Sequence, residues 1–226
     1  MHQAGILHRV YGRLQGETTL RYIRGIWNHT GTYCKFQKDV LSELGGAKPT
    51  TMDFKWRPRA DNKLIADFKN WLSLIAEARP DVIIVGMGVW TMRETNATVK
   101  GQQGYKDNLT AIVPYIRELR KHSHVMWIPQ DPIDEATLDD RRRMLSNKLV
   151  NKYNKIAKAV FETNGIPIWW SSFQIAHHFR SFFVPGDCIH LKSTFVDKYK
   201  SQILVNWLCK TQRGHTKVLA NAMYSE

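Results

Sequence analysis

The chain has 226 residues, of which 43% are hydrophobic and 23% charged, and its formal net charge is +13. This length can bury a large core without disulfides or metals, and the composition excludes a disordered or fibrous protein. No apolar run approaches the roughly 20 residues that a membrane helix requires, and the N-terminal apolar stretch is too short for a signal peptide. We therefore expect one domain over residues 1–226, with its core at about 9–210, that is either cytosolic or a piece of something longer.

The basic composition has two interpretations. A nucleic-acid-binding protein gathers Lys and Arg on one face, whereas a basic surface can also favour small acidic substrates or keep a protein in solution. The basic residues are spread along the chain, and the densest cluster, 141–143, directly follows two aspartates. Neighbouring opposite charges are typical of a solvated face. We therefore expect no nucleic-acid partner.

Cysteine and histidine spacing indicates neither a disulfide framework nor zinc. The three cysteines are an odd number and include no Cys-x-x-C pair. Potential ligands near the C-terminal end have no known zinc spacing, so we expect no metal; they are His177, His178, Cys188 and His190. Three Asn-x-Ser/Thr sequons are compatible with a secretory lumen but are frequent by chance; they begin at Asn28, Asn96 and Asn108.

Predicted strands and helices alternate along the chain. An alternating run predicts a strand near a sheet edge at 51–56, and continuous apolar runs predict buried strands at 81–86, 124–129 and 165–170. Apolar residues at helical spacing predict helices at 63–78, 104–121, 137–163 and 196–209. The first of these has a stripe that includes Ile75, and Thr137 is expected to cap the third. This order predicts an α/β fold, a three-layer sandwich with a central parallel sheet.

In such sheets the working residues lie in loops at the carboxyl ends of the strands. Three segments therefore matter, namely 86–90, 129–132 and the stretch after the last strand that leads to 187–190. In that last stretch Asp187 precedes His190 by three residues. The carboxylate could hold one imidazole nitrogen and leave the other free to take a proton from a nucleophile. The alternative is an aspartate that caps a helix beside a surface histidine.

A nucleophile is expected at the end of the first strand. There Gly16 and Glu17 are followed by Thr18 and Thr19, which open a helical stretch. A hydroxyl at that position lies near free backbone amides, which can hold an oxyanion. It can equally be a simple helix N-cap, and the spacing alone does not separate the two interpretations.

The sequence resembles a known family at these positions. Gly16-Glu-Thr-Thr-Leu-Arg21 resembles the Gly-Asp-Ser-x-x-Arg block of SGNH (GDSL-like) esterases and acyltransferases, and 187–190 resembles their Asp-x-x-His block. The segments between them resemble the luminal domain of the sialate O-acetyltransferases, relatives of the fungal capsule acetylation proteins. These segments are 52–56, 81–90, 125–132 and 151–155. The neurexophilin-and-PC-esterase group shares the end blocks and is a less close match.

The resemblance implies an SGNH-type (flavodoxin-like) fold and acetyl transfer through a covalent acyl-enzyme. Thr18 would be the nucleophile, His190 the general base and Asp187 the residue that orients it. It also assigns oxyanion or substrate contacts to Gly16, Arg21, Gly88, Trp90 and Gln130. The implied acceptor is a sialic acid glycan or nucleotide sugar, and the implied donor is acetyl-coenzyme A, with no bound cofactor. Golgi location, and a membrane region that this chain lacks, are implied as well.

Two residues depart from the family pattern. Thr18 stands where the family has serine, and Glu17 where it has aspartate. The methyl group of a threonine crowds the turn and restricts χ1. These departures leave a second hypothesis open, a catalytically inactive domain of the same fold that binds a glycan or a partner protein.

Overall fold

The computed structural model describes residues 36–41, 50–55, 57–180 and 189, together with 196, 199, 200, 202–204, 206 and 207. The chain divides into two compact units. One comprises residues 1–56 and 193–226, and the other residues 57–192. The expectation of a single domain over residues 1–226 stays a prediction.

The described part of the first unit contains an antiparallel hairpin. Strand β1 (Phe36–Leu41) pairs with β2 (Thr50–Lys55), with Phe36 opposite Lys55 and Leu41 opposite Thr50. The strand predicted at 51–56 is confirmed one residue earlier, and its partner β1 was not predicted. The described residues between 196 and 207 are all helical, in agreement with the predicted C-terminal helix.

The second unit is built on a small parallel sheet. Strand β3 (Val82–Val85) pairs in parallel with β4 (His124–Trp127), and Val85 lies opposite Trp127 at the carboxyl ends. Both runs were predicted as buried strands, and every second residue of β3 is buried. Most of the chain between the two strands is helical. The predicted mixed α/β architecture with a parallel sheet is therefore confirmed.

The third predicted strand of the sheet, 165–170, is reduced to a single bridge. Ile168 pairs in parallel with Trp127, whose N–H donates to the Pro167 carbonyl and whose carbonyl accepts from Trp169. Pro167 has no N–H with which to extend the ladder. Helix α7 (Trp170–His178) then begins where the strand was expected to continue.

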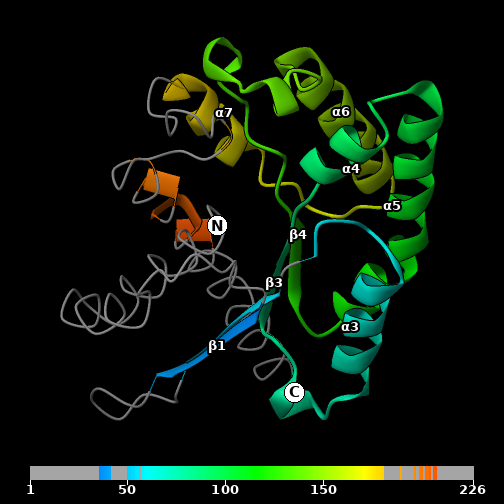
Figure 1. The fold of residues 1–226 in the computed structure, drawn as a ribbon. Helices are drawn as coiled ribbons and strands as arrows, with labels where there is room; N and C mark the ends of the chain where they lie inside the picture. Colours follow the sequence, from blue (N-terminus) through cyan, green and yellow to red (C-terminus); the bar gives the residue numbers. More distant parts are fainter. Residues whose placement is uncertain are drawn as a thin grey trace. The chain divides into compact units, whose positions relative to one another are not determined.

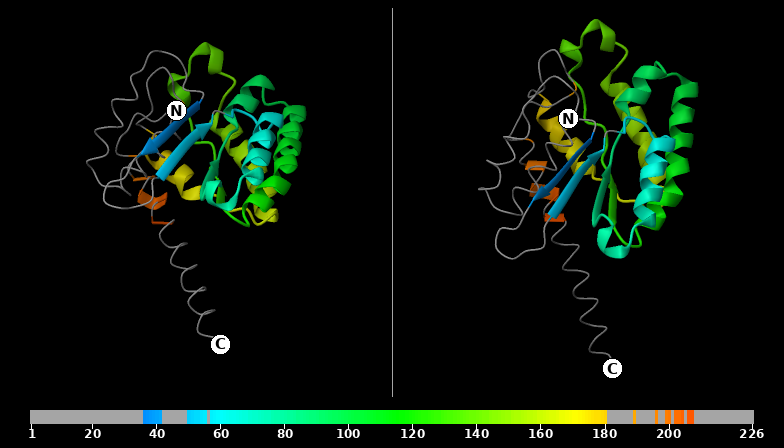
Figure 2. Two further views of the ribbon diagram at one scale, coloured as in Figure 1. Left: turned by 90° about the horizontal axis from the view of Figure 1, so that it is seen from below. Right: turned by 60° about the horizontal axis from the view of Figure 1, so that its bottom comes forward.

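Helices cover both sides of the β3–β4 pair. Figures 1 and 2 show α3 (Asn62–Ser73), α5 (Val99–Leu119) and α6 (Asn147–Thr163) on one side, and α7 on the other. The short helix α4 (Val89–Glu94) contacts both α5 and α6. The apolar faces of these elements form one core; its most deeply buried side chains include Phe68, Met92, Leu109, Ile112, Leu119, Trp127, Tyr153 and Phe161.

Three predicted helix boundaries are wrong. The helix predicted at 63–78 ends at Ser73, and Ile75, expected on its buried stripe, is 71% exposed before a 3-10 turn at Ala76–Ala78. The helix predicted from Thr137 begins after Ser146, which caps it, because 3-10 turns occupy Glu135–Thr137 and Asp140–Arg142. Helix α5 begins five residues before the expected Gly104, because the Thr98 side chain caps it by accepting from Gly101 N–H at 3.1 Å.

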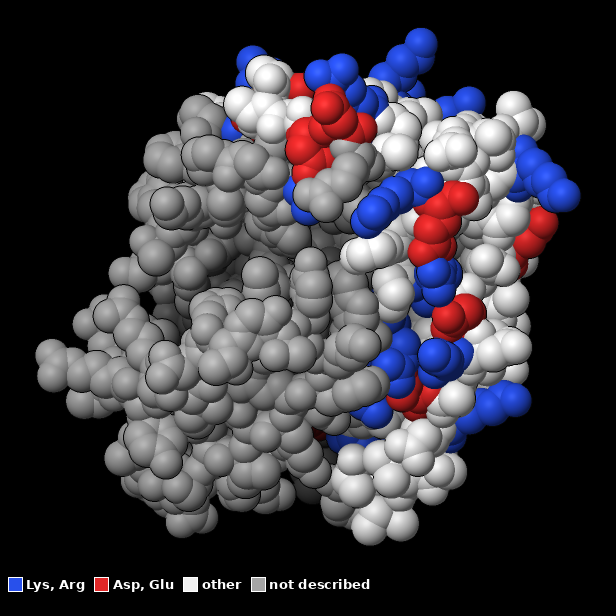
Figure 3. All heavy atoms as spheres, viewed as in Figure 1, with Lys and Arg blue, Asp and Glu red and all other residues white. Residues whose placement is uncertain are grey.

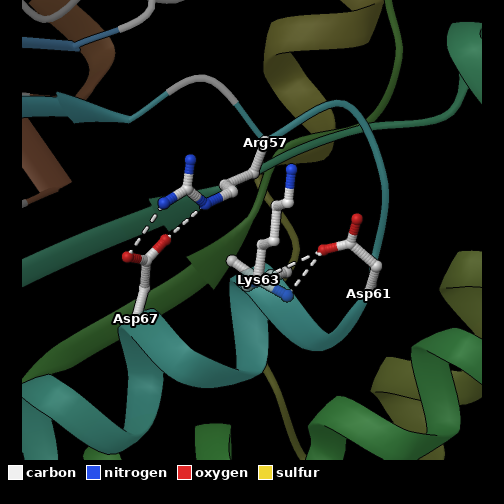
Figure 4. Close-up of polar contacts among 5 residues, drawn as sticks. Arg57, Asp61, Lys63 and Asp67 are labelled. Carbon is white, nitrogen blue, oxygen red and sulfur yellow. Dashed lines mark hydrogen bonds and ion pairs between the residues drawn. The ribbon is translucent and has the colours of Figure 1, made fainter.

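Local polar contacts position the start of α3, as Figure 4 shows. The Asp61 carboxylate accepts from the backbone N–H of Lys63 at 2.9 Å and of Leu64 at 3.2 Å, which satisfies two of the donors that a helix start leaves open. One turn later Asp67 forms a two-pronged ion pair with Arg57, at 2.6 and 3.1 Å. These contacts tie the first residues of the second unit to α3.

Candidate active site

Two of the predicted site residues meet at the carboxyl edge of the parallel sheet. Gly88 follows β3 and Gln130 follows β4. A Cβ atom added to Gly88 would lie 3.7 Å from Gln130 Cβ, which is ordinary van der Waals contact. The loops after these two strands, both of which the sequence had singled out, therefore lie side by side.

The loop after β3 is held at one peptide group. The Tyr105 hydroxyl, from α5, donates a hydrogen bond to the Met87 carbonyl at 3.1 Å. The next residue, Gly88, is the N-cap of α4, and its carbonyl accepts from Met92 N–H at 3.0 Å. Both Met87 and Gly88 are buried. The loop is thus held at two carbonyls, that of Met87 by the Tyr105 side chain and that of Gly88 by the backbone of α4.

Tyr105 lies in a fully buried aromatic pair. Its ring packs against that of Tyr153 from α6, with centroids 4.9 Å apart. Burial raises the pKa of Tyr105 well above its ordinary range, and the neighbouring Tyr153 adds to the shift, so the hydroxyl stays protonated and remains a donor. The Tyr153 hydroxyl lies 3.3 Å from Thr95 Oγ1. Because that threonine hydroxyl already donates to the Thr91 carbonyl at 2.7 Å, Tyr153 is the donor of this pair.

The loop after β4 is held by two asparagines of α6. Asn154 Oδ1 accepts from Gln130 N–H and its Nδ2 donates to the Gln130 carbonyl, both at 2.9 Å. Asn147 makes the same pair of bonds to the N–H and carbonyl of Ile133, both at 2.8 Å. The two asparagines are seven residues apart and so share one helix face. Four backbone groups of this loop are satisfied in this way.

The sequence indicated a loop position for Trp90, but this residue lies in the first turn of α4. Its side chain is half-buried, and the Arg93 guanidinium lies 5.4 Å from the ring centroid, within the range of a cation–π contact. At the end of the same helix Glu94 pairs with Arg59 through both carboxylate oxygens, which raises the pKa of Arg59. An aromatic surface is therefore present beside Gly88, with a cation on one of its faces.

The remaining predicted site residues lie outside the described residues. These are Gly16, Thr18, Arg21, Asp187 and His190. The proposed triad of Thr18, Asp187 and His190 stays a prediction. Ile189, between the last two in sequence, is described; it is half-buried and packs against the core of the second unit.

Sequence reasoning missed the residues that support the site, namely Tyr105, Asn147 and Asn154. Asn154 is only 3% exposed. A signal existed for the asparagines, since polar residues stood seven apart on the helix face that also carries Val150, Ala157 and Phe161. Tyr105 gave none, because an aromatic residue on the buried stripe of a helix is most simply explained as core.

Charges on the described surface are mixed in sign. On the face drawn in Figure 3, basic and acidic side chains of the described residues alternate rather than forming a field of one sign. In the 139–143 cluster, Arg143 Nη2 lies 2.7 Å from Asp140 Oδ1, and both side chains are largely exposed. The expectation that this cluster faces solvent is met at these two residues.

Within the described residues, no group of three or more His, Cys, Asp or Glu side chains could hold a metal ion. His177 and His178 are exposed at the end of α7, and the other two residues considered for a metal, Cys188 and His190, lie outside the described part. The absence of a metal stays a prediction. No described helix is both long enough and apolar enough to cross a membrane.

The chain is similar to known proteins in both sequence and structure. The chain is 32% identical over 162 residues to the N-acetylneuraminate (7)9-O-acetyltransferase of Danio rerio, a match that covers 71% of this chain and 20% of that protein. The crystal structure of a lipase/acylhydrolase from Enterococcus faecalis matches with a TM-score of 0.43 and 15% identity, over 66% of this chain and 71% of that chain. No protein-family model matches. The resemblance to the sialate O-acetyltransferases is confirmed: the chain is a homologue of the N-acetylneuraminate (7)9-O-acetyltransferase and spans about a fifth of that protein's length.

Proposed function

We propose that the chain is an SGNH-type domain that transfers an acetyl group to a glycan hydroxyl, or hydrolyses such an ester, with sialic acid as the acceptor. The similarity to the N-acetylneuraminate O-acetyltransferase over 162 residues carries this proposal. The geometry supports it, because Gly88 and Gln130, which the motifs assign to the oxyanion hole and substrate contacts, are adjacent at the carboxyl edge of the sheet.

In the proposed reaction the Thr18 hydroxyl attacks the carbonyl carbon of an acetyl donor, for which we propose acetyl-coenzyme A. His190, oriented by Asp187, takes the hydroxyl proton. The new carbon–oxygen bond forms as the bond from the acetyl group to the coenzyme's sulfur breaks, and the proton passes to the leaving thiolate. His190 then takes the proton of the acceptor hydroxyl, or of water, as that oxygen attacks the acetyl-Thr18 ester, and the proton passes to the Thr18 oxygen as the ester bond breaks.

The oxyanion formed in each step needs hydrogen-bond donors already in place. We propose the backbone N–H groups of Thr18 and Gly88 as two of them. Arg21, Trp90 and Gln130 would contact the acceptor, where a guanidinium suits the carboxylate of a sialic acid and an indole can pack on a sugar ring. The role of Gln130 is supported by its position next to Gly88.

The experiment is turnover by the full chain, with acetyl-coenzyme A and a sialylated glycan for transfer and an acetyl ester for hydrolysis. We expect His190→Ala and Thr18→Ala to abolish both reactions without loss of folded protein. Thr18→Ser should raise the rate, because it restores the family's less hindered nucleophile. His122→Ala, an exposed histidine after α5, is the matched control and should leave turnover unchanged. Undiminished turnover in His190→Ala would overturn the proposal.

Glu17 and Thr18 favour one alternative, an inactive domain that retains glycan binding. A fluorophosphonate that labels activated hydroxyls separates the two. Labelling that disappears in Thr18→Ala excludes the inactive domain. Absent labelling in a chain that still binds sialylated glycan supports the inactive domain and contradicts the enzyme.

We also propose a Golgi-lumen location, by analogy with the family that the sequence resembles. Of the three sequons, those at Asn96 and Asn108 present exposed asparagines, and Asn28 lies outside the described residues. Asn96 lies in the turn between α4 and α5 with φ of 46°, a conformation that asparagine tolerates well. When the chain is expressed through the secretory pathway, a glycosidase-sensitive increase in mass that Asn96→Gln reduces supports this location. Its absence at all three sequons removes that support.

A further inference from the structure

The Met87–Gly88 peptide group is fixed by a single buried side chain. Its carbonyl accepts from the Tyr105 hydroxyl at 3.1 Å. Peptide bonds of the described residues are all trans, so the carbonyl oxygen of Met87 and the N–H of Gly88 point in opposite directions across the same planar group. A hydrogen bond that holds the oxygen therefore also sets the direction of the N–H, away from Tyr105.

The N–H of Gly88 has no acceptor among the described residues, although Gly88 is buried. Buried backbone N–H groups without a partner are rare in native proteins, because leaving one unpaired costs the desolvation of the donor. The carbonyl of the same residue is satisfied by Met92 N–H. This peptide group is thus held at its oxygen, while its N–H has no acceptor in the part of the chain that the structure describes.

We infer that Tyr105 is a positioning residue, which holds the Met87 carbonyl so that the Gly88 N–H is aimed at the oxyanion of the reacting acetyl group. This inference rests on the proposed function and adds a residue to which the sequence assigned no role. Tyr105 touches no substrate. It acts by removing the freedom of the peptide to rotate, so that the donor needs no reorganisation when charge develops.

The surroundings of Tyr105 suit this role. Its ring packs on Tyr153 with centroids 4.9 Å apart, and its hydroxyl would lie 3.7 Å from a Cβ added to Gly88. Tyr153 is equally buried, but its hydroxyl bonds to Thr95 and not to the loop after β3. The chain therefore offers a matched pair: two stacked, buried tyrosines, each with one hydroxyl hydrogen bond, of which one reaches the site.

The kinetic test compares Tyr105→Phe with Tyr153→Phe in the full chain. Each variant removes one buried hydroxyl, so we expect similar decreases in melting temperature. Tyr105→Phe should lower kcat for acetyl-ester hydrolysis about tenfold with little change in KM, because the donor acts on the transition state. Tyr153→Phe should leave both constants within about twofold of wild type. Equal loss of kcat in the two variants would mean that Tyr105 is merely structural.

A second measurement does not depend on turnover. In glycine-labelled protein, the amide resonance of Gly88, assigned through Gly88→Ala, should shift in Tyr105→Phe and stay in place in Tyr153→Phe. An unmoved resonance in Tyr105→Phe overturns the positioning role, whatever the activity. A shifted resonance in a chain whose wild type turns over no acetyl substrate would support the fixed peptide and contradict the proposed function, so the two failures are distinguishable.

Discussion

The two loops at the carboxyl edge of the parallel sheet are fixed to very different degrees. After β4, two asparagines of α6 bind both backbone groups of Gln130 and of Ile133, which makes four hydrogen bonds. After β3, one tyrosine of α5 binds one carbonyl, that of Met87. The first loop thus has both backbone groups of two residues paired, whereas the second retains a buried N–H without a partner among the described residues.

The two loops therefore differ in which groups they can offer a substrate. Because the backbone groups of Gln130 are paired with Asn154, this residue can offer a substrate only its side chain. A loop held at one oxygen can keep its next N–H for a reacting group. The loop after β4, which has more hydrogen bonds, then provides the fixed surface beside Gly88.

Asn154→Ala should produce the largest effect, because Asn154 is the more deeply buried of the two asparagines that hold the loop after β4. It removes two hydrogen bonds and leaves the N–H and carbonyl of Gln130 unpaired, which should lower the free energy of unfolding by about 3 kcal/mol. Chemical denaturation measures it. Asn151→Ala, at an exposed position of the same helix, is the control and should cost little. Equal losses in the two variants would show that the clamp is not what holds the loop.

Asn147→Ala should act in the same direction with a smaller effect, about 1 to 2 kcal/mol, because Asn147 is half-buried and water can replace part of its bonding to Ile133. The same denaturation experiment measures it. If Asn147→Ala proves more costly than Asn154→Ala, the burial argument behind the ranking is wrong.

The raised pKa of Tyr105 predicts that the free energy of unfolding falls at high pH. Its pKa is raised in the folded state by burial, so above the ordinary tyrosine pKa of about 10 the unfolded chain releases a proton that the folded chain keeps. Stability from this group is complete below that pH and falls as the pH rises, by about 1.4 kcal/mol per pH unit. The decline in unfolding free energy above pH 10 should be shallower by that amount in Tyr105→Phe, and an unchanged slope would contradict the buried, neutral hydroxyl.

The sequence was sufficient for those parts of the site that local pattern determines. The apolar runs that became β3 and β4 were recognisable because both are continuous, and every residue of the two strands is buried or half-buried. The placement of Gly88 and Gln130 in loops after these strands then followed, since working residues in parallel sheets lie at the carboxyl ends of the strands.

The parts that could not be predicted depend on contacts between distant residues. Tyr105 and Met87 are 18 positions apart, and Asn154 and Gln130 are 24 apart. Boundaries were missed for local reasons. The expected strand at 165–170 is only one bridge at Ile168, because Pro167 has no N–H to donate. Helix α6 begins later than expected, because Asp134 bonds Thr137 and residues Glu135–Thr137 form a 3-10 turn. Helical periodicity does not reveal which polar residue on a buried stripe reaches a loop.

The central claim, acetyl transfer through Thr18, is tested most directly by the mass of the intact protein after brief incubation with an acetyl donor. We predict that the wild-type chain gains the mass of one acetyl group and that peptide mapping places it on Thr18. His190→Ala and Thr18→Ala should remain unmodified under the same conditions. An acetyl group that persists in Thr18→Ala, or a wild-type chain that turns over acetyl esters without ever carrying one on Thr18, would contradict the account.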